Sequence, residues 1–156
     1  MTIGHLGYPY VYDALIAVAY GLMLPPIAVL HPRHGRMRES GTTLATIAGT
    51  ATVAVGLAGS VNVDLRPAAL LILGIWWWTI GKMWAETEVL PRALGLPTAT
   101  LGALAIAAGI FASFSIGLAI VLPGTPDLGI WATGQVVLGS WLLVLAAALL
   151  RDTRPS

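Results

Sequence analysis

The chain has 156 residues, of which 57% are hydrophobic and only 10% are charged. An average soluble domain carries about 25% charged residues, so this chain lacks the polar side chains that would cover a water-facing surface. Its formal charge of +1 excludes a broad basic face for nucleic acid. Cysteine is absent, which excludes disulfides, thiolate metal sites and cysteine nucleophiles. We therefore predict an integral membrane protein with a single transmembrane domain over residues 1–156.

Apolar stretches long enough to cross a bilayer recur along the whole chain. About 20 residues are needed, because each helical residue advances about 1.5 Å through a hydrocarbon core of about 30 Å. The sequence predicts an all-α, polytopic transmembrane helical bundle. Its five spans are expected near residues 12–30, 42–60, 67–85, 99–121 and 129–150.

Basic residues gather at one set of span ends. Lys and Arg near span ends are retained on the cytoplasmic side of a membrane. Only Arg66 would lie on the opposite side from the other basic residues. The distribution favours an N-terminus outside and a C-terminus inside, in the bacterial inner membrane, with the basic loops in the cytoplasm. The seven residues on the cytoplasmic side are Arg33, Arg36, Arg38, Lys82, Arg92, Arg151 and Arg154.

Small residues recur at four-residue spacing in the second and fourth predicted spans. Residues at this spacing share one helix face, along which a neighbouring helix can approach closely. An Ala- and Gly-rich sequence also produces such strips by chance, and both explanations stay open. We expect these two helices to be central and to pack through Ala48, Thr52, Gly56 and Ser60, and through Ala105, Gly109, Ser113 and Gly117.

The first predicted span contains Pro25 and Pro26, which remove two amide donors and obstruct the preceding turn. A kink or an early helix end is expected there. Irregular backbone at membrane depth occurs where protein or a water-filled cavity covers it, although a plain bend near the interface is the simpler alternative. The candidate ligand pocket consists of Tyr20, Pro25, Pro26, Trp77 and Gln135.

Three tryptophans stand in a row at 76–78. Successive helical residues point about 100° apart, so at least one indole should face lipid or another subunit. Bulky packing is the ordinary role for such a run, and stacking on a ring-shaped cofactor is the alternative. Lys82 follows Trp78 by four residues, so a cation–π contact is available on one helix face.

No catalytic, metal or cofactor site is predicted. His31 and His34 are expected in the first basic loop and His5 on the other side of the membrane, so no histidine occupies a span interior. No serine has a nearby histidine or a nucleophile-elbow motif. The expected ligands are membrane lipids, and a specifically bound lipid is compatible with the composition.

The passage from Gly81 to Gly95 reads GKMWAETEVLPRALG. It resembles a connector in small uncharacterised bacterial integral membrane proteins, where a helix rich in Trp and Leu precedes Val-Leu-Pro-Arg-x-Leu-Gly and an Ala- and Gly-rich helix. The resemblance covers about residues 70–120. It implies a multispan bundle and supplies no substrate or catalytic residue.

Three functions are compatible with these features. The first is a non-catalytic accessory, scaffolding or assembly subunit of a larger membrane complex, which would contact other membrane subunits or itself through its small-residue strips. The second is a binder or transporter of a small, lipid-like molecule. The third is a cofactor-binding redox subunit. We expect the first, and we expect no enzymatic activity.

Overall fold

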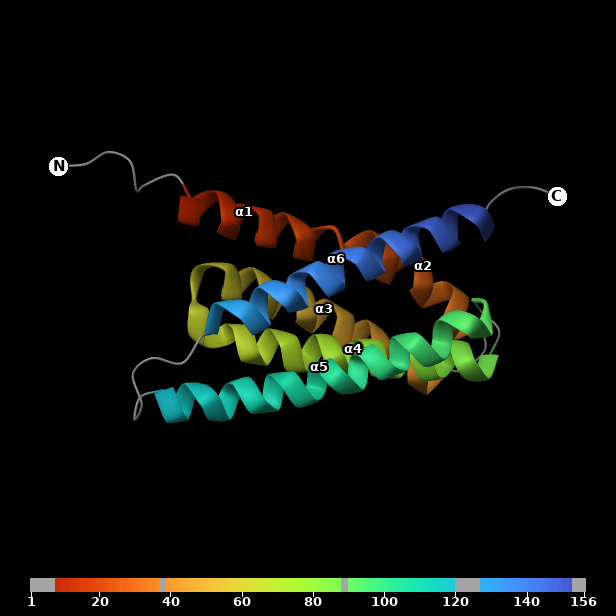
Figure 1. The fold of residues 1–156 in the computed structure, drawn as a ribbon. Coiled ribbons are helices and arrows are strands. Elements are labelled where there is room, and N and C mark those ends of the chain that lie inside the picture. Colours follow the sequence, from red (N-terminus) through yellow and green to blue (C-terminus); the bar gives the residue numbers. More distant parts are fainter. Residues whose placement is uncertain (1–7, 37–38, 88–89, 120–126, 153–156) are drawn as a thin grey trace. The chain divides into compact units, whose positions relative to one another are not determined.

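In a computed structural model of the protein, the described residues are 8–36, 39–87, 90–119 and 127–152. Every regular element within these ranges is a helix (Figure 1). The chain divides into two compact units, residues 1–117 and residues 118–156. The helices are α1 (Tyr8–Gly21), α2 (Leu24–Gly35), α3 (Glu39–Val61), the short 3-10 helix η2 (Val63–Leu65), α4 (Arg66–Thr87), α5 (Arg92–Ala119) and α6 (Asp127–Asp152).

The helices overlap all five predicted spans, and the largest difference is at α5, which begins at Arg92, seven residues before the predicted start of the fourth span. In the described part, four stretches are long and apolar enough to cross a membrane: Ala14–Gly35, Glu39–Val61, Arg66–Thr87 and Arg92–Phe114. In the second unit, α6 has 26 residues and includes the apolar stretch Gly139–Ala148. The prediction of an all-α chain is confirmed for the residues that the structure describes.

The first apolar segment is interrupted, as the sequence predicts. Helix α1 ends at Gly21, and Met23 closes the turn that follows by donating its N–H to the carbonyl of Tyr20 at 3.1 Å. Pro25 and Pro26 then stand in the first turn of α2, where a missing N–H leaves no helical hydrogen bond unmade. The prolines therefore begin a new helix immediately after the break.

The expected loop position of His31 and His34 is wrong, because α2 continues to Gly35. Pro32 removes one backbone donor from this helix but does not end it. The side of α2 that carries Ile27, Leu30 and His34 is buried, and spacings of three and four residues place these side chains on one face. This face packs on α3, so tertiary contacts extend the helix past the proline.

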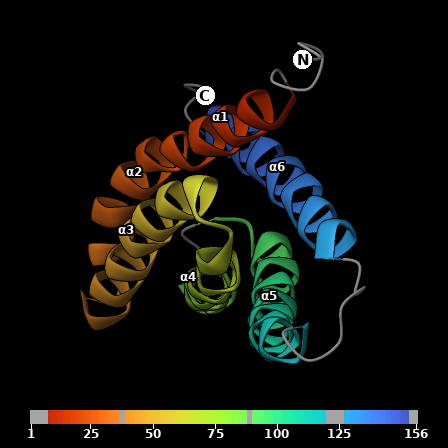
Figure 2. The same cartoon turned by 90° about the vertical axis from the view of Figure 1, so that its left-hand side faces the viewer.

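Helices α3 and α4 occupy the centre of the first unit. Helices α1, α2 and α4 all pack on α3, and α4 lies between α3 and α5 (Figure 2). Within the first unit, the third predicted span therefore lies at the centre beside the second, and the central place expected for the fourth span stays a prediction. The outer face of α5 exposes large apolar side chains, including Leu104 and Phe114.

A tight connection joins α3 to α4. The side-chain oxygen of Asn62 accepts a hydrogen bond from the backbone N–H of Asp64 at 3.1 Å, which forms a local turn. Arg66 donates from Nε to the carbonyl of Gly59 at 3.2 Å. A cationic side chain suits the carbonyl-rich C-terminal end of α3. These contacts return the chain alongside α3 within a few residues.

Helices α4 and α5 form an antiparallel hairpin whose backbones touch. Glycines recur at seven-residue intervals on both helices, and an interval of seven is close to two helical turns. A Cβ atom added at any of them would lie within 3 Å of backbone atoms of the opposite helix. We call this set the glycine seam: Gly74 and Gly81 on α4, and Gly95, Gly102 and Gly109 on α5.

The residues of α4 and α5 that face each other along the glycine seam follow a single antiparallel register. A Cβ on Gly74 would lie 2.6 Å from the backbone nitrogen of Ile106, and one on Gly109 would lie 2.8 Å from that of Leu71. About one helical turn further along α4, Gly102 lies against the backbone of Trp78. Small side chains permit close helix approach in membranes, where van der Waals contact drives association. The hairpin therefore has one fitted alignment.

Candidate functional site

Polar side chains gather where α2 meets α3 and α4. Helix α2 contributes His31 and His34, which are three residues apart and therefore lie near each other on the helix surface. Thr46 comes from α3, and Trp84 comes from α4. His34 and Trp84 are almost completely buried. We call these four residues the polar cluster.

The buried contact in the polar cluster joins α2 to α4. The indole Nε1 of Trp84 donates a hydrogen bond to Nε2 of His34 at 2.7 Å. The ring centroids are 6.3 Å apart and the rings are tilted by 36°. An indole nitrogen only donates, so Nε2 of His34 must be unprotonated and the neutral ring carries its proton on Nδ1. The hydrogen bond thus selects both the charge state and the tautomer of His34.

The second contact joins α2 to α3 at the surface. Nδ1 of His31 lies 2.6 Å from the hydroxyl oxygen of Thr46. A threonine hydroxyl can both donate and accept, so this contact suits either tautomer of a neutral imidazole. The two histidines therefore differ in the ring forms that their contacts permit. His31 is exposed, and its hydroxyl partner can donate or accept a hydrogen bond. His34 is buried, and its indole partner can only donate one.

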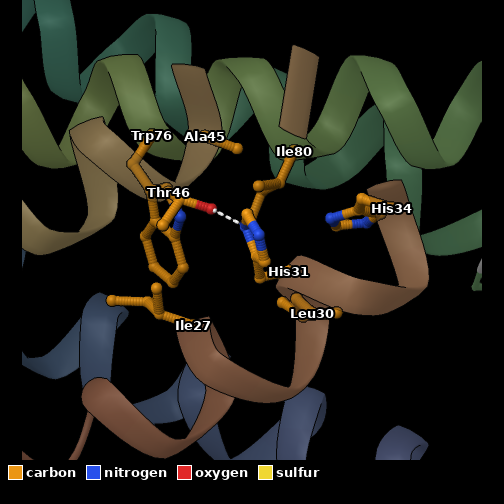
Figure 3. Close-up of a pocket in the computed structure, with 8 residues that line it drawn as sticks. All are labelled: Ile27, Leu30, His31, His34, Ala45, Thr46, Trp76 and Ile80. Atoms are coloured by element: carbon orange, nitrogen blue, oxygen red, sulfur yellow. Dashed lines mark hydrogen bonds between the residues drawn. The ribbon is translucent and has the colours of Figure 1, made fainter. Parts of the chain in front are cut away.

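A small pocket lies beside these side chains (Figure 3). Its α2 wall includes both histidines, and α3 and α4 supply the opposite walls. The space accommodates about one water molecule. Imidazole nitrogens and a hydroxyl can hold such a water by hydrogen bonds. The lining residues are Ile27, Leu30, His31, His34, Ala45, Thr46, Trp76 and Ile80.

Replacing His34 with leucine is expected to lower the free energy of unfolding by about 1–3 kcal/mol, because the buried N–H of Trp84 loses its acceptor. Trp84→Phe should cost a similar amount, since it leaves Nε2 of His34 unpaired. The double variant should lose less than the sum of the two, because neither unpaired group is then left. Unfolding in detergent micelles measures all three. Strictly additive losses would contradict a stabilising role for the hydrogen bond.

Among the candidate ligand-pocket residues whose side chains the structure describes, none lines the pocket of Figure 3. Tyr20 is fully buried against Gly56 of α3. Pro25 is exposed and Pro26 is half-buried in the first turn of α2. Trp77 is buried on α4. Gln135 belongs to α6, and its side chain lies outside the described part of the structure.

The packing strip on α3 is buried along its whole length. Its two hydroxyl groups bond to carbonyls of the same helix: Thr52 donates to Ala48 at 2.8 Å, and Ser60 donates to Leu57 at 2.7 Å. The strip therefore contacts its neighbours through small groups whose hydrogen bonds are already made. All four positions, Ala48, Thr52, Gly56 and Ser60, are buried.

The strip on α5 differs from the contact that the structure describes. Ala105 and Gly109 are buried and Ser113 is exposed, and Gly117 lies beyond the part of α5 whose burial the structure describes. Contact with α4 instead follows the seven-residue glycine spacing. Reading the α5 sequence only at four-residue intervals missed Gly95 and Gly102. The signal that could have found them is the same interval in the preceding helix, at Gly74 and Gly81.

The tryptophan run divides between the interior and the surface. Trp76 and Trp77 are buried, and Trp78 is 42% exposed. The ammonium of Lys82 lies 5.7 Å from the centroid of the Trp78 ring, so the predicted cation–π contact is confirmed. Trp76 lines the pocket and packs against Gly49 of α3, so this indole points inward.

Comparisons of the chain with protein-family models, with curated proteins and with solved structures found no match.

Proposed function

We propose that the chain is a non-catalytic integral membrane protein that acts as an accessory, scaffolding or assembly subunit of a larger membrane complex. The observation that carries the proposal is the glycine seam between α4 and α5, together with the buried small-residue strip of α3. These contacts are made by backbone atoms and small side chains, so they pack the helices closely against one another. Large apolar side chains are left on the outer faces, available to lipid or to other subunits.

The proposed topology has five spans, an external N-terminus and a cytoplasmic C-terminus in the bacterial inner membrane. The arrangement of the first unit supports it, because the hydrogen bond between His34 and Trp84 brings the ends of α2 and α4 together. The basic residues at those ends and at the start of α5 therefore share one side. Arg66 lies at the opposite end of α4. Retention of basic residues in the cytoplasm then orients the chain.

One observation favours the alternative of a lipid-like ligand. The buried indole nitrogen of Trp77 has no hydrogen-bond partner among the described residues. An unpaired buried donor costs about 1–3 kcal/mol, which a carbonyl or hydroxyl of a bound molecule would offset. Such a molecule would be small and amphipathic.

The test is purification of the tagged full-length protein from its native membrane in a mild detergent, followed by mass spectrometry of everything that elutes. A stoichiometric membrane protein is expected. Two matched variants locate its contact: Leu104→Ala with Phe114→Ala on α5, and Leu44→Ala with Ile47→Ala on α3, all at exposed positions. Loss of the partner in one variant but not the other would identify the binding face. A protein that elutes alone, or with a specific small molecule, would contradict the subunit proposal.

A further inference from the structure

Helix α2 depends on side-chain contacts for its position. It has 12 residues, and Pro32 deprives it of one internal hydrogen bond. Isolated helices of this length are marginal, so most of their stability comes from tertiary packing. Beyond its apolar contacts, α2 is joined to α3 through His31 and to α4 through His34.

The contact with α4 exists in only one charge state. Nε2 of His34 must accept the indole proton, and a protonated imidazole has no acceptor. Protonation would place two N–H donors against each other in a buried contact of 2.7 Å. It would also introduce a positive charge at a side chain that is 1% exposed. Protonation at low pH therefore weakens this contact in two ways: it removes the hydrogen-bond acceptor and it buries a positive charge.

We propose that the His34–Trp84 pair is a pH-sensitive switch, in which protonation of His34 releases the C-terminal half of α2 from α4. The break between α1 and α2 supplies a point about which α2 can move. Gly21, at the end of α1, has no neighbouring side-chain or backbone atom within 4 Å of a Cβ built on it. Movement there need not disturb the contact between Tyr20 and α3.

Other ionisable groups lie on the helices around His34 and bear on how it responds to pH. Apart from half-buried Arg33, all of those described are exposed. His31 is the other imidazole among these groups, and the remaining members are carboxylate, Lys and Arg side chains. The groups are His31, Arg33 and Arg36 on α2, Glu39 on α3, Lys82 and Glu86 on α4 and Arg92 on α5.

The sign of the response follows from proton linkage. A free imidazole takes up a proton near pH 6.5, and the closed contact excludes that proton. The ratio of closed to open protein should therefore fall by up to about tenfold for each pH unit below about 6.5. Above that range the contact stays closed.

Distance measurements between two spin labels test this switch. The chain has no cysteine, so the exposed positions in Arg36→Cys and Lys82→Cys can be labelled specifically in the full-length protein. In nanodiscs of phosphatidylcholine and phosphatidylglycerol, we expect one short distance at pH 7.5 and an added longer one at pH 5. A control pair, Lys82→Cys with Leu96→Cys, spans α4 and α5 and should not change. Broadening of both pairs would indicate general unfolding and overturn the proposal.

Three further variants test whether the pH-dependent change in distance arises from His34. His34→Gln offers an amide oxygen as acceptor and does not titrate, so the acid-induced distance should be lost. His31→Gln should keep it. Trp84→Phe removes the donor and should populate the longer distance already at pH 7.5. An unchanged distance in the parent protein, a response that persists in His34→Gln, or a response that is lost in His31→Gln would each overturn the proposal.

Discussion

Replacing Gly102 with alanine is expected to lower the free energy of unfolding by about 3 kcal/mol, the upper end of the usual cost of overpacking. The added methyl group would overlap the backbone of Trp78 and lie 2.8 Å from the carbonyl oxygen of Gly74. Backbone atoms of a helix cannot turn away as a side chain can. The two helices would have to separate along the glycine seam, which would weaken their other contacts.

Thermal or denaturant unfolding of the purified protein in detergent measures this loss. Gly81→Ala should behave in the same way, because its methyl group would overlap the backbone of Ala99. Gly21→Ala is the matched control, since a Cβ there meets no atom within 4 Å. We expect the control to change the stability by less than about 1 kcal/mol, because alanine is a better helix former than glycine. Equal effects at Gly21 and Gly102 would contradict the close approach of α4 and α5.

Alanine at Gly56 is expected to displace Tyr20 and to weaken the packing of α1 on α3, at a cost of about 1–3 kcal/mol. The Tyr20 side chain is fully buried, and a Cβ at position 56 would lie 2.5 Å from its Cε1 atom. The Tyr20 ring lies against the backbone of α3 at Gly56. A side chain at position 56 would occupy the space of the ring.

A double-mutant cycle separates this fit from a general effect on α3. Tyr20→Ala alone removes a large buried side chain and should cost about 3–5 kcal/mol. In the Tyr20→Ala background, the methyl group at position 56 has room, so adding Gly56→Ala should cost almost nothing further. The coupling would then equal the whole effect of Gly56→Ala, which unfolding in detergent measures. Independent, additive losses would refute the contact.

The helices could be predicted from the sequence because helix length, apolar content and proline breaks are local properties. The Pro25–Pro26 pair shows this, since α1 ends just before it. The end of α2 could not be predicted in the same way. Pro32 favours a helix end there, and burial of Leu30 and His34 outweighs that local preference.

The polar cluster could not be predicted because its members are distant in sequence. His34 and Trp84 are 50 residues apart, and His31 and Thr46 are 15 apart. In the sequence alone, two histidines near three arginines are typical of a solvated basic loop. Only the packing of α2 on α3 and α4 turns one of them into a buried acceptor.

The sequence by itself determined the helical class of the described residues, their long apolar helices and the small residues through which helices can approach. These follow from composition and from spacing within a single segment. Only the tertiary structure decided which faces meet. Glycine can lie against any neighbour, and it was the antiparallel pairing of α4 with α5 that brought Gly74, Gly81 and Gly102 into one line of backbone contact. That pairing, with α3 on the other side of α4, also explains why the third span lies at the centre of the first unit.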